Sequence, residues 1–389
     1  MGKKTGIEWT DSTWSPIRVR VRKDAAAIAR EKGYASLVEI AEKMAGRVGQ
    51  HCEHVSAGCE HCYAEANNHR CLPANGTGLP YDRRSRDLVE AFVDEKVLLA
   101  PLKWGPCHWY DQDDGEVTGD RPRLIFVENQ SDIFGDWVTD EMRDRVCAVG
   151  IVSGHILQFL TKRPEEMLRY FSDPETSNRI MEEIEENLTD DFAFKWPYPN
   201  FWLGVSVENQ AAADARIPIL LRTPAAVRFI SAEPLLSPVN LNQLGPGPWP
   251  LWGPLSGYCP RHYPRKRCKC DKQIPSIDWV ICGGESGPNA RPMHPFWVWS
   301  LQKQCRSAEV PFFFKQWGEW DSCFDETGGY EASTKGLMTI WETGYFTGYG
   351  VIPSDPNRGV GYIVKRVGKE AAGALLNGRE WKQFPRVSG

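Results

Sequence analysis

The chain has 389 residues, of which 41% are hydrophobic and 25% charged, so it can bury a sizeable core and is not a generally disordered polypeptide. Its formal net charge of −5 argues against a protein dominated by non-specific affinity for nucleic acid, although a local basic surface remains compatible with it. No secretory signal and no membrane-length apolar run is visible, so we expect a cytoplasmic protein with reduced thiols.

The first predicted element is a short strand near Ile7–Trp9, which ends in a turn at Pro16. The segment 18–49 begins with basic residues and then shows apolar side chains at helical spacing. We interpret this segment as a helical insertion that separates the first strand from a loop rich in cysteine.

A regular alternation of strands and helices follows along the chain. Six apolar runs are typical of buried strands, and each is followed by polar residues: 124–127, 156–160, 201–205, 227–231, 279–282 and 312–314. Helices are expected between them over 139–152, 164–171, 211–221 and 296–308. Such alternation predicts an α/β fold with a parallel sheet, in the form of a partial (β/α) barrel of six or more strands. Its ligand site is expected at the carboxyl ends of the strands.

Three segments interrupt this alternation and are predicted to be insertions: 18–49, an acidic helical segment over 172–199, and a cysteine-rich segment over 242–275. We therefore predict a barrel domain over residues 1–320 that carries these insertions. Residues 321–389 are rich in glycine and lack the alternation, so we predict a C-terminal extension there.

Three cysteines, Cys52, Cys59 and Cys62, occur in the spacing Cys-x6-Cys-x2-Cys. Three thiolates can hold three corners of an iron–sulfur cluster and leave the fourth iron open for another ligand. The alternative is a zinc knuckle completed by a neighbouring histidine, for which the candidates are His51, His54 and His61. We favour the cluster, because the cysteines follow the first strand of a βα pattern whose later strands all end in polar residues.

Several motifs occur in order around this loop: Tyr63 after the third cysteine, Ser-Asp after a strand, Leu-Thr-Lys-Arg-Pro, Gly-Val-Ser-Val-Glu-Asn-Gln, Ser-Ala-Glu-Pro-Leu-Leu, Gly-Gly-Glu-Ser-Gly-Pro and Phe-Lys-Gln-Trp-Gly. Together they resemble the three-cysteine phage protein family related to radical S-adenosylmethionine (SAM) enzymes. The resemblance covers residues 5–17 and 50–320. The usual radical SAM loop is Cys-x3-Cys-x2-Cys, so this chain has three extra residues between its first two cysteines.

The resemblance implies a radical SAM type of partial barrel, in which Cys52, Cys59 and Cys62 hold a 4Fe-4S cluster and SAM chelates the fourth iron. An electron from a flavodoxin- or ferredoxin-like donor would cleave SAM to methionine and a 5′-deoxyadenosyl radical, which abstracts a substrate hydrogen. The family context implies a nucleobase substrate, such as a hypermodified pyrimidine of phage DNA or a free nucleotide. A peptide substrate stays open as an alternative.

The polar residues at the strand ends are assigned by what SAM requires. Its ammonium needs acceptors, its carboxylate needs a cation, and its ribose hydroxyls need carboxylate or amide partners. The resulting candidate cofactor-binding residues are Tyr63, Ser131, Asp132, Lys162, Arg163, Ser206, Glu208, Asn209, Glu233, Gly283, Gly284 and Glu285. Lys315 and Gln316 are candidates for contact with substrate. For each of them, a strand-end cap or a salt bridge is the alternative interpretation.

A second group of metal ligands, Cys259, His262, Cys268 and Cys270, has the composition of a tetrahedral zinc site. Basic residues surround it, and a stiffened basic knuckle suits contact with a nucleic-acid backbone. The alternatives are an auxiliary iron–sulfur cluster or unligated thiols. If both cysteine groups held zinc, the chain would instead be a non-catalytic, zinc-stabilised nucleic-acid-binding protein.

Overall fold

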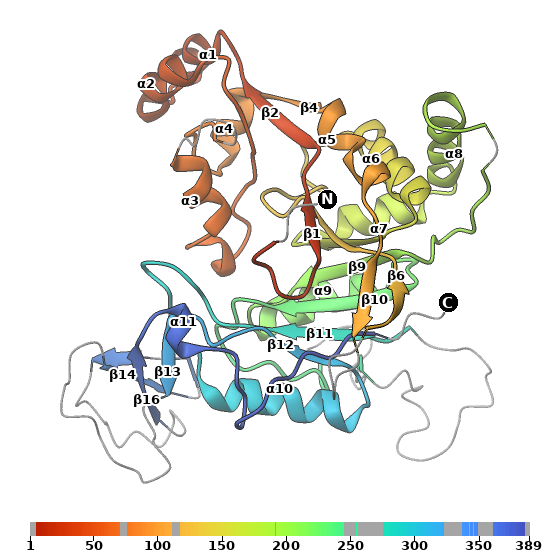
Figure 1. Ribbon diagram of the computed structural model, residues 1–389. Helices are drawn as coiled ribbons and strands as arrows, with labels where there is room; N and C mark the ends of the chain where they lie inside the picture. The colour runs from red at the N-terminus through yellow and green to blue at the C-terminus, as the bar shows by residue number, and fades with distance from the viewer. Residues whose placement is uncertain are drawn as a thin grey trace. The chain divides into compact units, whose positions relative to one another are not determined.

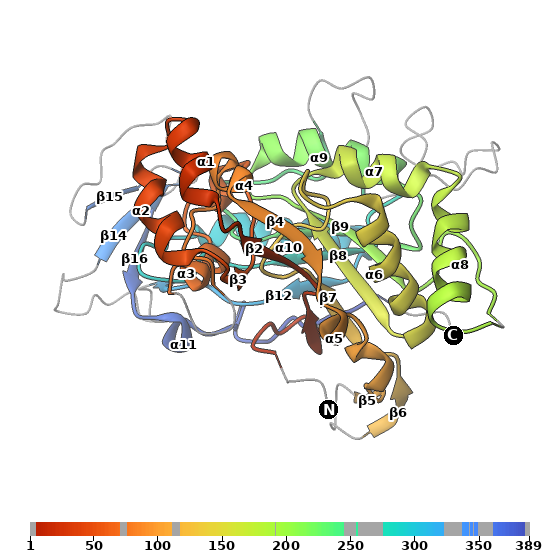
Figure 2. The ribbon, with the colours of Figure 1, turned by 90° about the horizontal axis from the view of Figure 1, so that it is seen from above.

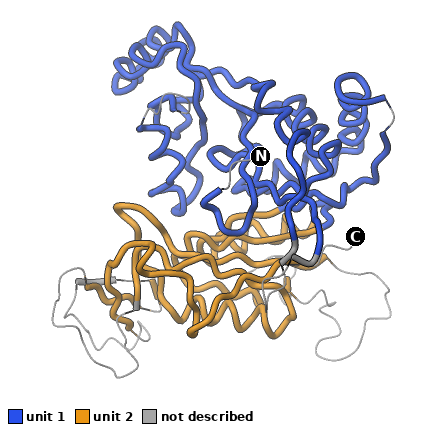
Figure 3. The backbone as a smooth tube through the Cα atoms, in the orientation of Figure 1, with its two compact units in different colours: residues 1–203, 223–226 blue, residues 204–222, 227–389 orange. Residues whose placement is uncertain are grey.

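The computed structural model describes residues 5–70, 76–110, 117–190, 192–244, 254–255, 275–322, 337–341, 343–344, 346–348 and 361–385. The chain forms two compact units, which Figure 3 shows in different colours. Unit 1 comprises Met1–Leu203 and Thr223–Ala226, and unit 2 comprises Gly204–Arg222 and Val227–Gly389. The boundary between the units runs through one strand, β9 (Phe201–Ser206).

A seven-stranded sheet has the order β1-β7-β8-β9-β10-β11-β12. Its strands are β1 (Ser12–Trp14), β7 (Leu124–Val127), β8 (Ile156–Thr161), β9, β10 (Val227–Ala232), β11 (Trp279–Cys282) and β12 (Phe312–Phe314). The pairs β1–β7, β7–β8, β10–β11 and β11–β12 are parallel. The predicted α/β class with a parallel sheet is thereby confirmed, and all six apolar runs are strands.

The predicted position of the first strand was wrong. Residues 7–10 form a turn, in which the Thr10 N–H donates to the Ile7 carbonyl oxygen at 3.4 Å. Pairing with β7 begins only at Asp11, whose N–H donates to the Leu124 carbonyl oxygen at 3.0 Å. The strand therefore lies at Ser12–Trp14. Trp9 is buried, but it belongs to the turn that precedes the strand.

In unit 1, helices α6 (Asp140–Ser153), α7 (Pro164–Ser172) and α8 (Thr176–Asn187) follow β7 and β8, and α8 packs against the other two (Figure 2). Helix α6 begins where the Thr139 hydroxyl accepts the Met142 N–H, and it ends at Gly154 with φ of 68°. Helix α7 begins at a proline, which is preorganised for the first helical position. The predicted helices are confirmed, and α8 occupies the predicted acidic insertion.

The insertion predicted over 18–49 is not wholly helical, because it begins within strand β2 (Ile17–Val21). This strand pairs antiparallel with β3 (Val48–Gly49) and β4 (Val89–Val93). Helices α1 (Ala25–Glu31) and α2 (Ala35–Met44) pack with the sheet's inner face in a common core (Figure 1). The alternation of buried Ile17, Val19 and Val21 with arginines has the two-residue period of a strand.

Short elements complete unit 1: η1 (Ala57–Cys59), α3 (Tyr63–His69), α4 (Arg83–Asp87), α5 (Glu95–Leu98), η2 (Ala100–Lys103) and the hairpin β5 (Cys107–Tyr110) with β6 (Val117–Arg121). In unit 2, α9 (Gln210–Arg222) follows β9, and α10 (Pro295–Ser307) follows β11 and packs against β12. Each helix among the described residues is too short or too polar to cross a lipid bilayer.

The end of the chain adds a second sheet to unit 2. Its antiparallel strands are β13 (Trp320–Ser322), β14 (Leu337–Trp341), β15 (Phe346–Gly348) and β16 (Gly361–Arg366), in the order β13-β16-β14-β15, and α11 (Lys369–Ala372) follows them. The chain then returns to the parallel sheet, where the Phe314 N–H donates to the Trp381 carbonyl oxygen at 2.7 Å. The segment predicted to be an extension therefore completes the edge of β12.

Candidate functional site

The three cysteines lie in unit 1, on the loop that connects β3 to α3. Two contacts fix this loop to neighbouring segments: the Ser131 hydroxyl donates to the His51 carbonyl oxygen at 2.6 Å, and the His54 N–H donates to the Tyr81 carbonyl oxygen at 3.1 Å. At Gly49, a Cβ atom would lie 2.7 Å from the Thr77 nitrogen, so only glycine permits this close approach of two backbones. The loop is thus held from both sides.

All three thiols are free rather than joined in disulfides; Cys59 is buried, and Cys52 and Cys62 are half-buried. Burial, followed by the negative charge of Asp132, raises the pKa of Cys52 to about 12, and Cys62 and Cys59 contribute to the same shift. Burial also raises the pKa of Cys62, against the opposing effect of the Glu65 and Ala64 N–H groups that point at its sulfur. The three sulfurs therefore share one electrostatic environment.

The donor chemistry of the loop fits a cluster or metal ion that is held by three thiolates, because the thiols are reduced, close to one another and largely shielded from water. Within the described part of the chain, however, no three His, Cys, Asp or Glu side chains converge closely enough to hold a metal ion. The three thiols therefore lie near one another, but their sulfur atoms are not close enough to bind one metal ion together.

Asp132, which follows β7, is saturated by donors of its own unit. Its carboxylate accepts from the Thr161 hydroxyl at 2.8 Å, the Phe134 N–H at 3.0 Å, the Lys162 N–H at 3.3 Å and the Arg163 guanidinium at 3.2 Å. This buried carboxylate ties the end of β7 to the end of β8. Its predicted role as a direct acceptor for SAM stays a prediction, and the geometry supports a positioning role for Asp132.

Lys162 and Arg163 bring positive charge to the thiols. Although burial opposes it, the negative charge of Asp132 and of Cys52 raises the pKa of Arg163, whose guanidinium also lies 5.0 Å from the centre of the Trp137 ring. The Lys162 ammonium makes no hydrogen bond or ion pair with any residue the structure describes, and its charge lowers the pKa of Cys62. Lys162 is therefore a cation beside the thiols whose ammonium donors are unengaged by the described residues.

The neighbouring histidines and Tyr63 have distinct surroundings. His51 is buried against Trp137, and its Nε2 lies 3.8 Å from Glu53 Oε1, beyond hydrogen-bond reach, so this nitrogen has no hydrogen-bond partner. His54 Nε2 lies 2.8 Å from a carboxylate oxygen of Glu65. The hydroxyl of Tyr63 donates to the carbonyl oxygen of Asn129, in the segment that follows β7.

Glu128 is a residue of this region that the sequence analysis did not single out. It follows β7 directly, is only 2% exposed, and has a φ of 53°, which is uncommon for a residue with a side chain. One carboxyl oxygen accepts the Ile17 N–H at 2.8 Å, and the other has no hydrogen-bond partner. Burial raises the pKa of Glu128 well above its usual range. The sequence feature that could have identified Glu128 is its position directly after the apolar run 124–127.

In unit 2, the candidate ribose-binding residues after β9 are engaged within the fold. Arg216 of α9 donates to the buried Glu208 carboxylate and to the Ser206 carbonyl oxygen, both at 2.8 Å. The Asn209 side-chain oxygen accepts the Ala212 N–H at 2.9 Å and caps α9. The alternative interpretation of a salt bridge and a cap describes Glu208 and Asn209, and their role toward SAM stays a prediction.

The Gly-Gly-Glu motif after β11 is also engaged in contacts within the fold. Glu285 receives three donors from Arg291: its N–H and its Nε at 2.8 Å, and its Nη2 at 2.6 Å. At Gly284, a Cβ atom would lie 2.1 Å from the Trp317 carbonyl oxygen, so this position requires glycine. Gln316 is buried and donates to the Gly284 carbonyl oxygen at 2.9 Å. The motif therefore joins the ends of β11 and β12.

Glu233 and Lys315 form the remaining pair of candidate residues, and they follow β10 and β12 respectively. The Lys315 ammonium contacts one oxygen of the Glu233 carboxylate, and both side chains retain some exposure, at 13% and 20%. Gly283, which follows the intervening strand β11, lies beside both of them. The structure thus brings three of the predicted residues together.

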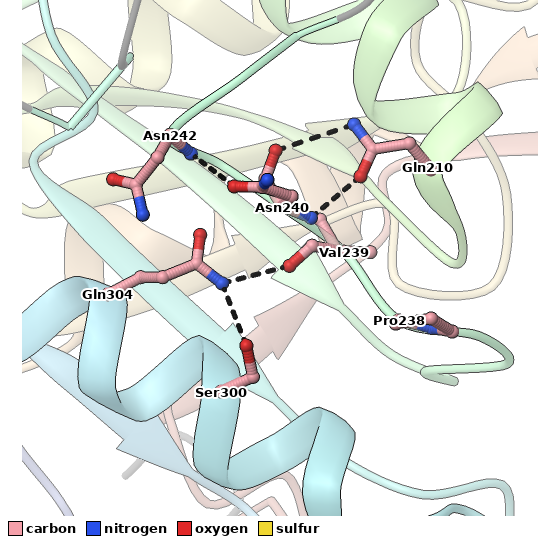
Figure 4. Close-up of a pocket in the computed structure, with 7 residues that line it drawn as sticks. All are labelled: Gln210, Pro238, Val239, Asn240, Asn242, Ser300 and Gln304. Atoms are coloured by element: carbon pink, nitrogen blue, oxygen red, sulfur yellow. Dashed lines mark hydrogen bonds between the residues drawn. The ribbon is translucent and has the colours of Figure 1, made fainter. Parts of the chain in front are cut away.

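A pocket of about 510 Å³ lies between α9, α10 and the segment 238–242 of unit 2 (Figure 4). Gln210 accepts the Asn240 N–H at 2.6 Å, and Gln304 accepts the Leu241 N–H at 2.6 Å and donates to the Val239 carbonyl oxygen at 3.0 Å. These amides therefore hold the chain segment itself. None of the sequence-predicted site residues lines this pocket.

The second predicted metal group, Cys259, His262, Cys268 and Cys270, lies outside the described residues.

One comparison with known proteins gives a result: residues 35–385 match the family model described as "Protein of unknown function (DUF5131)". No match was found among curated proteins or among solved structures. Because the matched segment covers most of the sequence, the chain belongs to the DUF5131 family.

Proposed function

We propose that this protein is a radical SAM enzyme, related to the three-cysteine phage proteins, with a barrel of the radical SAM type that acts on a nucleobase in the cytoplasm. The observation that carries the proposal is the loop of three free, clustered thiols, held by Ser131 and flanked by Lys162 and Arg163. Cys52, Cys59 and Cys62 would hold a 4Fe-4S cluster. When bound, the cluster and SAM supply a 5′-deoxyadenosyl radical, using one electron from a flavodoxin- or ferredoxin-like donor.

The residues around the thiols have definable tasks in this proposal. The raised pKa values of Cys52 and Cys62 mean that the metal-free loop holds protons, which are released when the sulfurs become ligands. Within the described part of the chain the Lys162 ammonium has no partner, so its N–H donors can bind a carboxylate such as that of SAM. Arg163 compensates the charge of Asp132 and of the Cys52 thiolate, so it stabilises the ionised form of the loop.

A second candidate function has one observation in its favour. His51 precedes Cys52, and its buried Nε2 has no hydrogen-bond partner. That nitrogen would complete a Cys3His zinc site and give a non-catalytic, zinc-stabilised nucleic-acid-binding protein. We favour the enzyme, because Lys162 and Arg163 bring two cations to the thiols, which a closed structural zinc site does not require.

Anaerobic reconstitution with iron and sulfide separates the two functions. We expect a brown protein with about four iron atoms per chain that forms 5′-deoxyadenosine from SAM and a reductant. The Cys59→Ala variant loses both properties, whereas Cys107→Ala, which changes a half-buried thiol outside the loop, keeps both. A colourless protein that binds zinc and leaves SAM intact would contradict the proposal.

A further inference from the structure

We propose that Glu233 and Lys315 recognise the edge of a nucleobase that presents an N–H group beside a carbonyl, as thymine and uracil do. The inference rests on the proposed function, because it names the substrate class of the same enzyme. It concerns unit 2 alone, and it is tested by a binding measurement that requires neither iron nor SAM.

The register of the strands places the pair. Ala232, Cys282 and Phe314 are aligned across β10, β11 and β12, so the three strands end together. The residues that follow them are Glu233, Gly283 and Lys315. The backbone supports this alignment, because the Gly283 N–H donates to the Ala232 carbonyl oxygen at 3.1 Å and the Lys315 N–H donates to the Cys282 carbonyl oxygen at 2.8 Å.

Glycine at position 283 places no side chain in the space next to the two charged groups. A Cβ atom there would lie 3.4 Å from Glu233 Cδ and 3.4 Å from Lys315 Cβ, which is ordinary van der Waals contact. Even a methyl group would therefore occupy space directly beside the pair. The backbone at Gly283 does not have the positive φ that favours glycine, in contrast to Gly318, whose φ is 88°.

The pair has unused hydrogen-bonding capacity, which its neighbours lack. Within the described residues, Lys315 donates to one oxygen of Glu233, so the second oxygen and two N–H groups remain unengaged. In contrast, both oxygens of Glu285 accept from Arg291, and both oxygens of Glu208 accept from Arg216. Among the described candidate carboxylates Glu208, Glu233 and Glu285, only Glu233 keeps an unengaged oxygen beside a cation with unengaged donors.

The chemistry of the pair defines what it recognises. A carboxylate only accepts and an ammonium only donates, so the two present an acceptor beside a donor. The complementary ligand has an N–H donor next to a carbonyl oxygen, as at N3 and O4 of thymine or uracil. A sugar diol both donates and accepts at each hydroxyl, so it does not require opposite charges. Because the pair is mostly shielded from water, a ligand that lacks the N–H leaves a desolvated carboxylate without its donor.

The test measures binding of thymidine 5′-monophosphate and of its N3-methyl derivative to the full chain by isothermal titration calorimetry. The methyl group removes the N–H and keeps the ring, sugar and phosphate. We expect the N3-methyl derivative to bind about tenfold more weakly or worse, and Glu233→Gln and Lys315→Met to weaken thymidine monophosphate binding to a similar extent. Gly283→Ala retains both charges and is expected to weaken binding by filling the adjacent space.

Matched controls are Glu370→Gln and Lys369→Met, which change exposed residues of unit 2 and are expected to leave binding unchanged. Circular dichroism of each variant confirms that it is folded, and Gly283→Ala tests the same space without loss of the ion pair. The inference is overturned if thymidine monophosphate does not bind at millimolar concentration, if both ligands bind equally, or if none of the three variants weakens binding.

Failure of this inference differs from failure of the proposed function. If SAM is cleaved but the N3-methyl derivative binds as well as its parent, the recognition pair is wrong and the enzyme class stands. If thymidine monophosphate binds through Glu233 and Lys315 but the reconstituted protein leaves SAM intact, the pair is correct and the radical SAM assignment is wrong. The Cys59→Ala variant is expected to retain nucleotide binding, since the two features lie in different units.

Discussion

The residues that follow β7 and β8 in unit 1 hold a loop, whereas those that follow β10 and β12 in unit 2 hold each other. Asp132 accepts from four groups of its own unit, and its partner Arg163 faces Cys52. Glu233 accepts from Lys315 alone and has a glycine at its side. In unit 1 the charged groups hold the loop that carries the three thiols, while in unit 2 the charged pair retains unused donors and an unused acceptor.

The carboxylates that follow the strands differ in how many hydrogen bonds they accept from the protein itself. A carboxylate that is saturated by internal donors contributes to the fold, and its removal leaves a buried cation without compensation. A carboxylate with an unused oxygen contributes less to the fold and retains capacity for a ligand. The number of internal donors, which differs among Asp132, Glu285 and Glu233, therefore predicts the consequence of each substitution.

The largest effect is expected for Asp132→Asn. The substitution removes a buried charge that compensates the half-buried Arg163 and one acceptor of the Thr161 network, so the free energy of unfolding should fall by about 3 kcal/mol. Urea denaturation measures it. The control Asp136→Asn changes a carboxylate that is 71% exposed, and we expect a change within about 0.5 kcal/mol. Equal effects of the two substitutions would refute the positioning role of Asp132.

A direct comparison within unit 2 comes next. Glu285→Gln should lower the free energy of unfolding by about 3 kcal/mol, because Arg291 loses a carboxylate that accepts three of its donors. Glu233→Gln should cost about 1 kcal/mol, because Lys315 keeps some contact with water and loses a single hydrogen bond. If the cost at Glu233 equals or exceeds that at Glu285, the Glu233 pair is a structural element.

A pH-dependent effect is expected at Glu128, where burial raises the pKa above that of the unfolded chain. A raised pKa in the folded state means that the stabilising contribution is complete below the unfolded pKa of about 4.3 and is lost as the pH rises toward the folded value. Glu128→Gln keeps an acceptor for the Ile17 N–H and stays neutral. The free energy of unfolding of this variant, relative to that of wild type, should therefore increase as the pH rises from 4 to 7, by on the order of 1 kcal/mol.

Denaturation at several pH values between 4 and 8 measures this difference. The control Glu141→Gln changes an exposed residue in the first turn of α6 and should give a profile parallel to that of wild type. A parallel profile for Glu128→Gln as well would show that Glu128 is ionised in the folded protein.

The smallest change in stability is expected for Lys162→Met, because this ammonium makes no hydrogen bond among the described residues. The free energy of unfolding should stay within about 0.5 kcal/mol of wild type. In the reconstituted protein, the same substitution should weaken SAM binding about tenfold, through the loss of a charge-assisted hydrogen bond. Unchanged SAM affinity would remove Lys162 from the site.

Much of the fold was predictable because buried parallel strands leave a plain signal. The runs 124–127, 279–282 and 312–314 coincide with β7, β11 and β12, since each is apolar throughout and ends in polar residues. Strand β2 was not predicted, because its alternating arginines were interpreted as a basic start to a helical insertion. The first strand was misplaced because a buried tryptophan in a turn resembles one in a strand.

The candidate site was less predictable than the fold. Spacing was enough to single out Cys52, Cys59 and Cys62, but it does not reveal which strand-end residues are already engaged. Glu285 and Arg291 are six residues apart across a loop, so their pairing depends on the tertiary course of that loop. The Glu233–Lys315 pair joins residues 82 positions apart through strand register alone.

The most direct test of the central claim is electron paramagnetic resonance of the anaerobically reconstituted, reduced protein, recorded with and without SAM. We expect the signal of a reduced 4Fe-4S cluster, and we expect the shape of this signal to change when SAM binds, because three cysteines leave one iron open. Cys59→Ala should abolish the signal, and Cys107→Ala should leave it unchanged. A cluster signal that SAM does not alter, or a protein that holds zinc and gives no signal, would contradict the account.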